Sequence, residues 1–150
     1  MELNSRCYSF TKLSLRLPYM LDTNICIYVL KNHSDKLRLK FNTTQDLAIS
    51  SVVYAELCYG IENSDSPKKQ LRWEQLDLFT QSLQIISWDE KAAKHYGSIR
   101  AILKRQGTPI GNNDLLIAAH ARSLNAVLAT NNVREFNRVP DLRVDNWLSC

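Results

Sequence analysis

Four acidic side chains follow or begin the regular elements that the sequence predicts. Asp22 follows the apolar run YML, Glu56 lies within VVYAELCYGI, Asp114 opens DLLIAAHA, and Glu135 comes after TNNVR. Two carboxylates 4 Å apart repel each other by roughly 4 kcal/mol at an effective dielectric constant of about 20. A hard divalent cation such as Mg²⁺ or Mn²⁺ removes that repulsion, because it prefers oxygen ligands and often bridges carboxylates to a phosphate. The four acids therefore indicate metal-dependent hydrolysis of a phosphodiester.

Each of these acids also has an ordinary structural explanation. Asp22 can cap the helix that follows it, and Asp114 can complement the positive end of a helix dipole. Glu56 can form a buried salt bridge with an arginine, and Glu135 can pair with arginines beside it on the surface. Residue types and spacing alone leave the metal site and these explanations about equally open.

The hydrophobic pattern predicts the elements that position the acids. Short apolar runs, at residues 19–22, 46–53, 83–89, 125–132 and 142–147, alternate with helical patterns, at 25–31, 34–42, 52–61, 70–82, 89–106 and 114–124. This alternation predicts an α/β fold with a mostly parallel sheet of about four to five strands. Right-handed crossovers bring the carboxyl ends of parallel strands to one edge, where the four acids would meet.

Individual side chains carry three further predictions. Ser50 or Ser51 is expected to cap the helix that carries Glu56. His120, within the apolar run IAAHA, is expected to be a partly buried structural histidine and not a catalytic base. In the helix at 70–82, the expected inner side carries several large apolar residues, namely Leu71, Leu76, Leu78, Phe79 and, directly after the helix, Leu83.

Length and composition favour one globular domain in the cytoplasm. The chain has 150 residues, 45% of them hydrophobic, and no apolar run long enough to span a membrane. Residues 1–19 lack the continuous apolar centre of a secretory signal, and we expect them to be a poorly ordered extension before a domain at 20–150. The four cysteines form no C-x-x-C pair, which favours a reducing compartment, and the net charge of +4 is compatible with a polyanionic partner.

Four longer strings together resemble one known family. MLDTN (20–24), SSVVYAELCYGIE (50–62), GTPIGNNDLLIAAHA (107–121) and TNNVREFNRVPDLRVDNW (130–147) are similar to the motifs of PIN-domain ribonucleases. They most resemble the VapC toxins of type II toxin–antitoxin systems, in the branch of tRNA(fMet)-specific endonucleases. The resemblance implies a three-layer α/β/α domain and Mg²⁺-dependent, or Mn²⁺-dependent, endoribonuclease activity. It also implies a homodimer, inhibition by a VapB antitoxin that covers the cleft, and cleavage of initiator tRNA in the anticodon stem-loop.

The resemblance also implies roles for particular residues. Asp22, Glu56 and Asp114 match the family's metal-binding acids, and the fourth position falls to Glu135 or to Asn132. The polar residues that would support the acids are Thr23, Asn24 and Asn132. Several cations can form a basic rim for RNA, namely Lys36, Arg38, Lys40, Lys104, Arg105, Arg134 and Arg138.

Two other functions remain open on the sequence alone. A PIN-like domain that binds RNA or protein without cutting it would need a broken acidic set, yet all three matching acids are present. A deoxyribonuclease would use the same metal chemistry on a different sugar. A P-loop nucleoside triphosphatase is excluded, because the sequence has no G-x-x-x-x-G-K-[ST] motif.

Overall fold

One five-stranded parallel sheet forms the centre of the protein, whose computed structural model describes residues 18–148. The strands lie in the order β3-β2-β1-β4-β5, and every neighbouring pair is parallel. Their bounds are β1 (Tyr19–Leu21), β2 (Leu47–Ser50), β3 (Gln84–Ile86), β4 (Val127–Thr130) and β5 (Arg143–Asn146). The helices are α2 (Thr23–Leu30), α3 (Asp35–Thr43), α4 (Ser51–Glu62), α5 (Lys69–Gln81), α6 (Glu90–Gln106), α7 (Asn112–Ser123) and α8 (Val133–Phe136).

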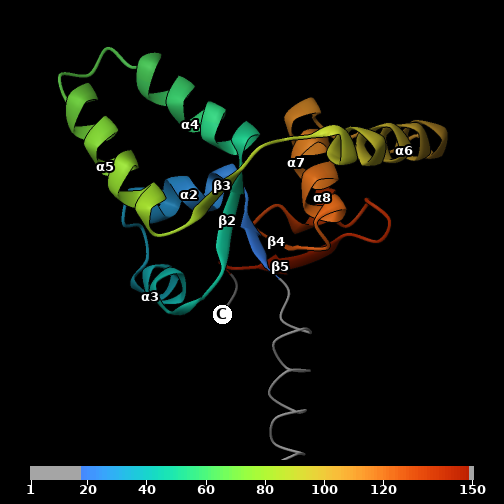
Figure 1. The fold of residues 1–150 in the computed structure, drawn as a ribbon, viewed down its shortest axis with the longest axis horizontal. Helices are drawn as coiled ribbons and strands as arrows, with labels where there is room; N and C mark the ends of the chain where they lie inside the picture. Colours follow the sequence, from blue (N-terminus) through green and yellow to red (C-terminus); the bar gives the residue numbers. More distant parts are fainter. Residues whose placement is uncertain (1–17, 149–150) are drawn as a thin grey trace, which may run out of the picture.

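Helices flank the sheet on both sides, as the predicted α/β/α fold requires. In Figure 1, α2, α3 and α5 lie to the left of the strands and α6, α7 and α8 lie to the right. The chain moves from β1 outward through β2 to β3, then returns past β1 to form β4 and β5. This change of direction places a topological switch point between β1 and β4, which is where open α/β sheets bind ligands.

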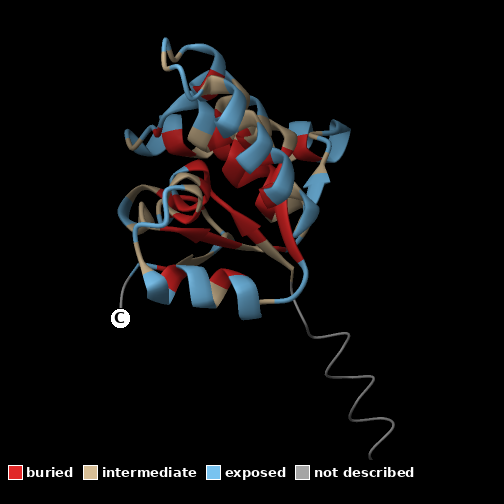
Figure 2. Cartoon of the chain, turned by 90° about the vertical axis from the view of Figure 1, so that its left-hand side faces the viewer, coloured by how far each residue is buried: buried red, intermediate tan, exposed pale blue. Residues whose placement is uncertain are grey.

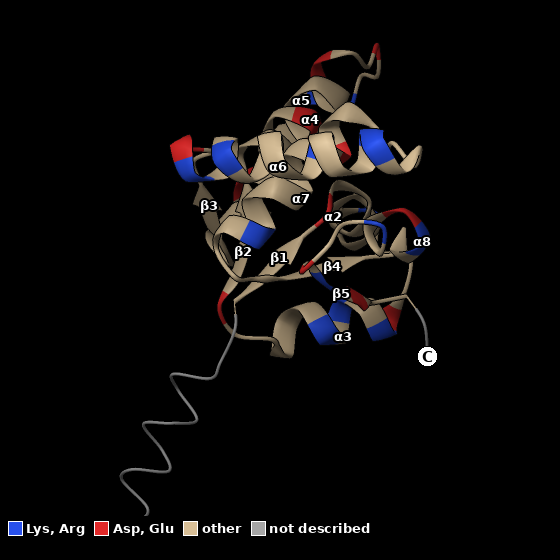
Figure 3. Ribbon diagram, turned by 90° about the vertical axis from the view of Figure 1, so that its right-hand side faces the viewer, with Lys and Arg blue, Asp and Glu red and all other residues tan. Residues whose placement is uncertain are grey.

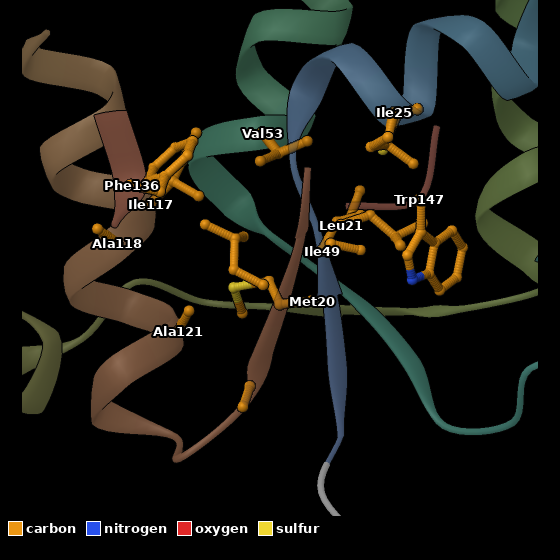
Figure 4. Close-up of a cluster of buried hydrophobic side chains, with 14 of the residues drawn as sticks. Met20, Leu21, Ile25, Ile49, Val53, Ile117, Ala118, Ala121, Phe136 and Trp147 are labelled. Carbon is orange, nitrogen blue, oxygen red and sulfur yellow. The ribbon is translucent and has the colours of Figure 1, made fainter. Parts of the chain in front are cut away.

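The core fills the space between the sheet and the helices on each side. Successive residues of a strand point to opposite faces, so Met20 and Leu21, both fully buried, serve different sides of the sheet. Figure 4 shows Met20 on the side of Ala121 in α7, and Leu21 toward Ile25 in α2 and Trp147 after β5. Buried segments accordingly run through the strands and the inner faces of the helices, with exposed residues on the outside (Figure 2). The short strand β1 is therefore anchored from both faces.

Local signals explain most helix ends. Ser50 caps α4, because its Oγ accepts a hydrogen bond from the Val52 N–H at 3.1 Å. Asp89 caps α6 in the same way, and Gly107 ends that helix with a φ of 70°, in the left-handed region that glycine adopts without a side-chain clash. Capping therefore fixes where α4 and α6, two of the longer helices, begin or end.

The prediction for the inner side of α5 was wrong in part. Leu76 and Phe79 are buried, whereas Leu71 and Leu78 are 48% and 65% exposed. Residues 76 and 79 are one turn apart and face the core, while Leu71 and Leu78 are seven residues apart and lie on a separate stripe of the helix. Both stripes have helical spacing, so the pattern could not tell which one packs against the domain.

The predicted extension at residues 1–19 lies outside the described residues except at its end. Tyr19 belongs to β1, and the Pro18 carbonyl accepts a hydrogen bond from the Val127 N–H at 2.9 Å. Pro18 and Tyr19 therefore contribute to the sheet, although they precede the predicted domain start at residue 20. No helix within residues 18–148 is both long and apolar enough to cross a membrane.

Candidate metal-dependent nuclease site

The carboxyl ends of the two central strands hold the first predicted acid. Asp22 follows β1 directly, and its N–H donates to the Ala129 carbonyl of β4 at 2.9 Å. In the register between these strands Leu21 pairs with Ala129, so Asp22 lies level with Thr130. The Asp22 side chain therefore projects at the switch point.

Hydrogen bonds to both oxygens fix the Asp22 carboxylate. Its Oδ1 accepts from the Thr23 N–H at 2.7 Å, which is the predicted helix cap, and its Oδ2 accepts from Thr130 Oγ1 at 2.7 Å. The Thr130 hydroxyl in turn accepts from the Asn132 N–H at 2.9 Å. Burial raises the pKa of Asp22, which is only 4% exposed, while the bonds from Thr130 and Thr23 act to lower it. Capping and a place in the acidic site are therefore compatible roles for Asp22.

Thr130 is the site residue that sequence reasoning did not assign. The available signal was that Thr130 is a polar residue at the end of a buried strand. That strand lies beside the one that precedes Asp22. Using that signal required knowing that β4, the fourth strand in sequence, lies beside β1.

Glu56 extends from the second turn of α4 with one oxygen left without a partner. The side chain is half-buried, and its Oε1 is buried with no hydrogen-bond partner among the described residues, as is the Oγ1 of Thr23. Burial raises the pKa of Glu56, and the negative charge of Asp22 raises it further. The nearby Thr23 hydroxyl acts to lower this pKa, although it does not reach hydrogen-bond geometry. No arginine in residues 18–148 forms an ion pair with Glu56. The salt-bridge explanation for this acid therefore fails.

Asp114 experiences the negative charge of all three other acids. Burial, repulsion from Asp22, Glu135 and Glu56, and a hydrogen bond with Glu135 together raise the pKa of Asp114 to about 6. Electrostatic coupling of this kind requires proximity, so Asp114 lies within electrostatic range of the other three predicted acids.

The remaining predicted polar residues lie around this group. Asn132 Nδ2 donates to Glu135 Oε2 at 3.2 Å, and Glu135 forms no ion pair with an arginine in the described chain. The predicted surface pairing of Glu135 is therefore not found. Asn24, one position beyond Thr23 in the first turn of α2, is exposed.

His120 has the structural position that was predicted, although it is more deeply buried. Only 1% of it is exposed, and its Nδ1 lies 2.7 Å from the Oγ of Ser50, which is fully buried. Burial lowers the pKa of His120, with the charge of Asp89 acting in the opposite direction. Because Ser50 also caps α4, the pair joins α7 to the start of the helix that carries Glu56.

The chemistry of the four acids fits a hard divalent cation. Among residues 18–148, no three His, Cys, Asp or Glu side chains are already gathered closely enough to form a metal site. The side chains that converge nevertheless present only oxygen donors, and two of these, Thr23 Oγ1 and Glu56 Oε1, are buried without partners. A cation would satisfy such oxygens and relieve the repulsion that raises the pKa of Asp114. The residues present therefore fit Mg²⁺ or a similar ion.

Comparisons with known proteins identify the family of this chain. Residues 19–142 match the model of the PIN domain. Ribonuclease VapC2 of Rickettsia felis is 48% identical over 135 residues, which cover 86% of this chain and 97% of that protein. The tRNA(fMet)-specific endonuclease VapC of Salmonella typhimurium is 44% identical over 132 residues, covering 87% and 98%.

A solved structure shows the same fold. The structure of DNA-bound VapBC from Salmonella typhimurium superposes with a TM-score of 0.81 at 42% identity, covering 88% of this chain and 99% of that one. The chain belongs to the PIN-domain family and, within it, to the VapC ribonucleases of VapBC toxin–antitoxin systems.

Proposed function

We propose that this ribonuclease uses Mg²⁺ to cleave initiator tRNA in the anticodon stem-loop and thereby stops translation initiation. The negative charges of three other acids, Asp22, Glu56 and Glu135, act together with burial to raise the pKa of Asp114 to about 6, and this supports the proposal. Relatives at 44% and 46% identity are named tRNA(fMet)-specific endonucleases, which supports the choice of substrate. An inactive binding module would not need to maintain this mutual repulsion.

Asp22, Glu56 and Asp114 would hold the metal. The bound ion would supply an activated water and charge stabilisation at the phosphate, and Mn²⁺ offers the same oxygen-ligand chemistry. Asp22 is oriented in advance, since its two oxygens are fixed by the Thr23 N–H and the Thr130 hydroxyl. Such fixed ligands cost little reorganisation when substrate arrives.

Glu135 would act at the edge of the site and not as a central ligand. Asn132 Nδ2 donates to its Oε2 at 3.2 Å, and the negative charge of Glu135 is one of those that raise the pKa of Asp114. A carboxylate in this position can accept a proton from the attacking water or position that water. We therefore assign the fourth position to Glu135, with Asn132 supporting it.

The function is tested with purified full chain and a labelled anticodon stem-loop of initiator tRNA. We expect cleavage in Mg²⁺ or Mn²⁺, none in EDTA, and none by Asp22→Ala. Asp77→Ala is the matched control, because Asp77 is an exposed acid on α5 away from the site. Intact RNA at high concentrations of enzyme and of both metals would refute the proposal, and equal cleavage of a DNA stem-loop would change the substrate class.

We further propose that the protein works in the cytoplasm as a dimer that a VapB antitoxin inhibits. Solved structures of relatives at 40% to 44% identity are of VapBC from three bacteria, which supports a partner of this kind. Co-expression with the antitoxin from the same operon should restore growth that the toxin alone arrests. Light scattering on the isolated protein measures the predicted dimer.

A further inference from the structure

An open pocket with two unpaired cations lies where α6 ends and α7 begins. Its volume is about 680 Å³, and Arg100, Lys104 and Asn112 supply its polar groups. Apolar side chains line the rest of it, among them Leu103, Ile110 and Leu115. We refer to this cavity as the α6–α7 pocket.

Neither cation in the pocket is neutralised. No carboxylate in the described part of the chain forms an ion pair with Arg100 or Lys104, and no acidic residue lines the pocket. Two positive charges in one cavity repel each other, so a ligand that accepts hydrogen bonds and carries negative charge would bind favourably there.

The arginine of the pocket is held by a short chain of contacts. Arg100 Nη1 donates to Tyr96 Oη at 2.8 Å, and its guanidinium lies over the Tyr96 ring at 5.9 Å from the centroid. Tyr96 Oη donates to Asn112 Oδ1 at 3.1 Å, and the Trp88 ring packs edge-on against Tyr96 at 6.3 Å. Trp88, which precedes α6, also donates its Nε1–H to the Leu116 carbonyl of α7 at 3.0 Å, so these contacts fasten α6 and the segment before it to α7. An arginine positioned in advance loses less side-chain entropy when it binds a ligand.

The pocket adjoins the acidic site through α7. Asn112 is the first residue of that helix, and the Asp114 carboxylate lies close to the residue before it, because a Cβ on Gly111 would be 3.5 Å from Asp114 Oδ2. Gly111, at the cap position, has no side chain that could accept a hydrogen bond from the first N–H groups of α7. Arg138 Nη1 donates to the carbonyl of Pro109, in the loop between α6 and α7, at 3.1 Å. Figure 3 shows Lys and Arg segments along α6 on the face of the molecule that also presents α7 and α8.

We propose that the α6–α7 pocket binds a backbone phosphate of the RNA next to the scissile bond, with Arg100 and Lys104 as its ligands. This inference rests on the proposed function, because it places a second contact on the same substrate strand. Phosphate contacts of this kind set the register of a nucleic acid and carry no sequence information themselves. Arg100 and Lys104 therefore act as positioning residues, which determine where the strand crosses Asp114.

The first test measures RNA binding in EDTA, so that the result does not depend on cleavage. The probe is a 5′-fluorescein-labelled anticodon stem-loop of initiator tRNA, followed by fluorescence anisotropy. We expect Arg100→Gln and Lys104→Gln each to weaken binding about 10- to 150-fold, the loss expected for one charge-assisted hydrogen bond. The slope of log K against log salt should decrease by about 0.7 for each single-strand phosphate contact that is lost.

Two lysines on the same helix provide matched controls. Lys91 and Lys94 are exposed on α6 and do not line the pocket. Their substitution by glutamine removes the same charge from the same element, so it corrects for the general attraction of RNA to a basic surface. Equal losses of affinity in all four variants would overturn the inference.

A neutral-phosphate scan identifies the contact itself. Single methylphosphonate substitutions are placed one at a time along the RNA near the cut. We expect one position to weaken binding to the parent protein and to have no effect on binding to Arg100→Gln. A position that costs the same affinity in both proteins would refute the assignment.

Cleavage by the parent separates the two proposals. If the parent cleaves RNA in Mg²⁺ while the pocket variants bind like the lysine controls, the pocket inference fails and the nuclease proposal stands. The opposite outcome is that the parent does not cleave RNA, yet the methylphosphonate scan still finds a phosphate whose effect depends on Arg100. In that case the nuclease proposal fails and the pocket remains a phosphate site. In the expected case, KM rises in the pocket variants while kcat changes little.

Discussion

Replacing Asp114 by asparagine should stabilise the metal-free protein while it abolishes cleavage. Burial and the charges of Asp22, Glu135 and Glu56 raise the pKa of Asp114 to about 6, which means that ionised Asp114 destabilises the folded state. Asparagine removes the charge at nearly unchanged size, and its amide can still donate a hydrogen bond to Glu135. The substitution therefore relieves repulsion without leaving a cavity.

The size of the effect follows from the pKa. A value of about 6 in place of the ordinary 3.8 corresponds to roughly 3 kcal/mol, at 1.36 kcal/mol per pKa unit. Because Asp114 is only half-buried, solvent screens part of this energy, and we discount it to about 1–2 kcal/mol. In a domain of this length, 1 kcal/mol changes Tm by roughly 2–4 °C, so the variant should melt about 2–8 °C above the parent.

The dependence on pH has a definite sign. In the folded chain Asp114 ionises near pH 6, whereas in the unfolded chain it ionises near 3.8. Above pH 6 both states are ionised and the folded state carries the full penalty, which disappears as the pH falls toward about 4. The Tm difference between Asp114→Asn and parent should therefore be largest near neutral pH and vanish near pH 4.

Calorimetry of both proteins in EDTA across this pH range tests the reasoning, and titration with Mg²⁺ completes it. Mg²⁺ should raise the Tm of the parent more than that of the variant, since a ligand that binds only the folded state stabilises it. A variant that melts below the parent at neutral pH would refute the electrostatic account. So would a Tm difference that stays constant with pH.

Three further outcomes are expected. Glu56→Gln should lower kcat at least about 100-fold without changing Tm. Glu135→Gln should lower kcat only about tenfold, as substitutions beside a metal site do. Near-normal cleavage by Glu56→Gln would remove Glu56 from the mechanism. Ser50→Ala should leave the buried His120 without its hydrogen-bond partner and lower the free energy of unfolding by about 1–3 kcal/mol, as measured in thermal melts. Cleavage at 25 °C should be preserved. Loss of cleavage in a folded variant would instead give His120 a catalytic role. Deleting residues 1–17 should leave both Tm and kcat unchanged, and a large fall in Tm would show that this segment contributes to the fold.

Local signals predicted the elements well, because each depends on neighbouring residues. Asp89 and Gly107 mark the two ends of α6 by capping chemistry alone, and the strands follow from short apolar runs. Contacts between distant segments could not be predicted in this way. The hydrogen bond between Thr130 and Asp22 joins residues 108 positions apart, and it depends on a strand order that the sequence pattern does not specify.

Helix capping and metal binding do not compete for Asp22, and the structure explains why. A capping bond uses one oxygen and fixes the side-chain torsions, which is also what a preorganised ligand needs. Thr130 holds the second oxygen through its hydroxyl proton, a bond that leaves lone pairs on both carboxylate oxygens. The structural explanation and the functional one therefore describe the same geometry. An acid at the end of a central parallel strand can cap the next helix and, because it does so, present a fixed carboxylate to a cation.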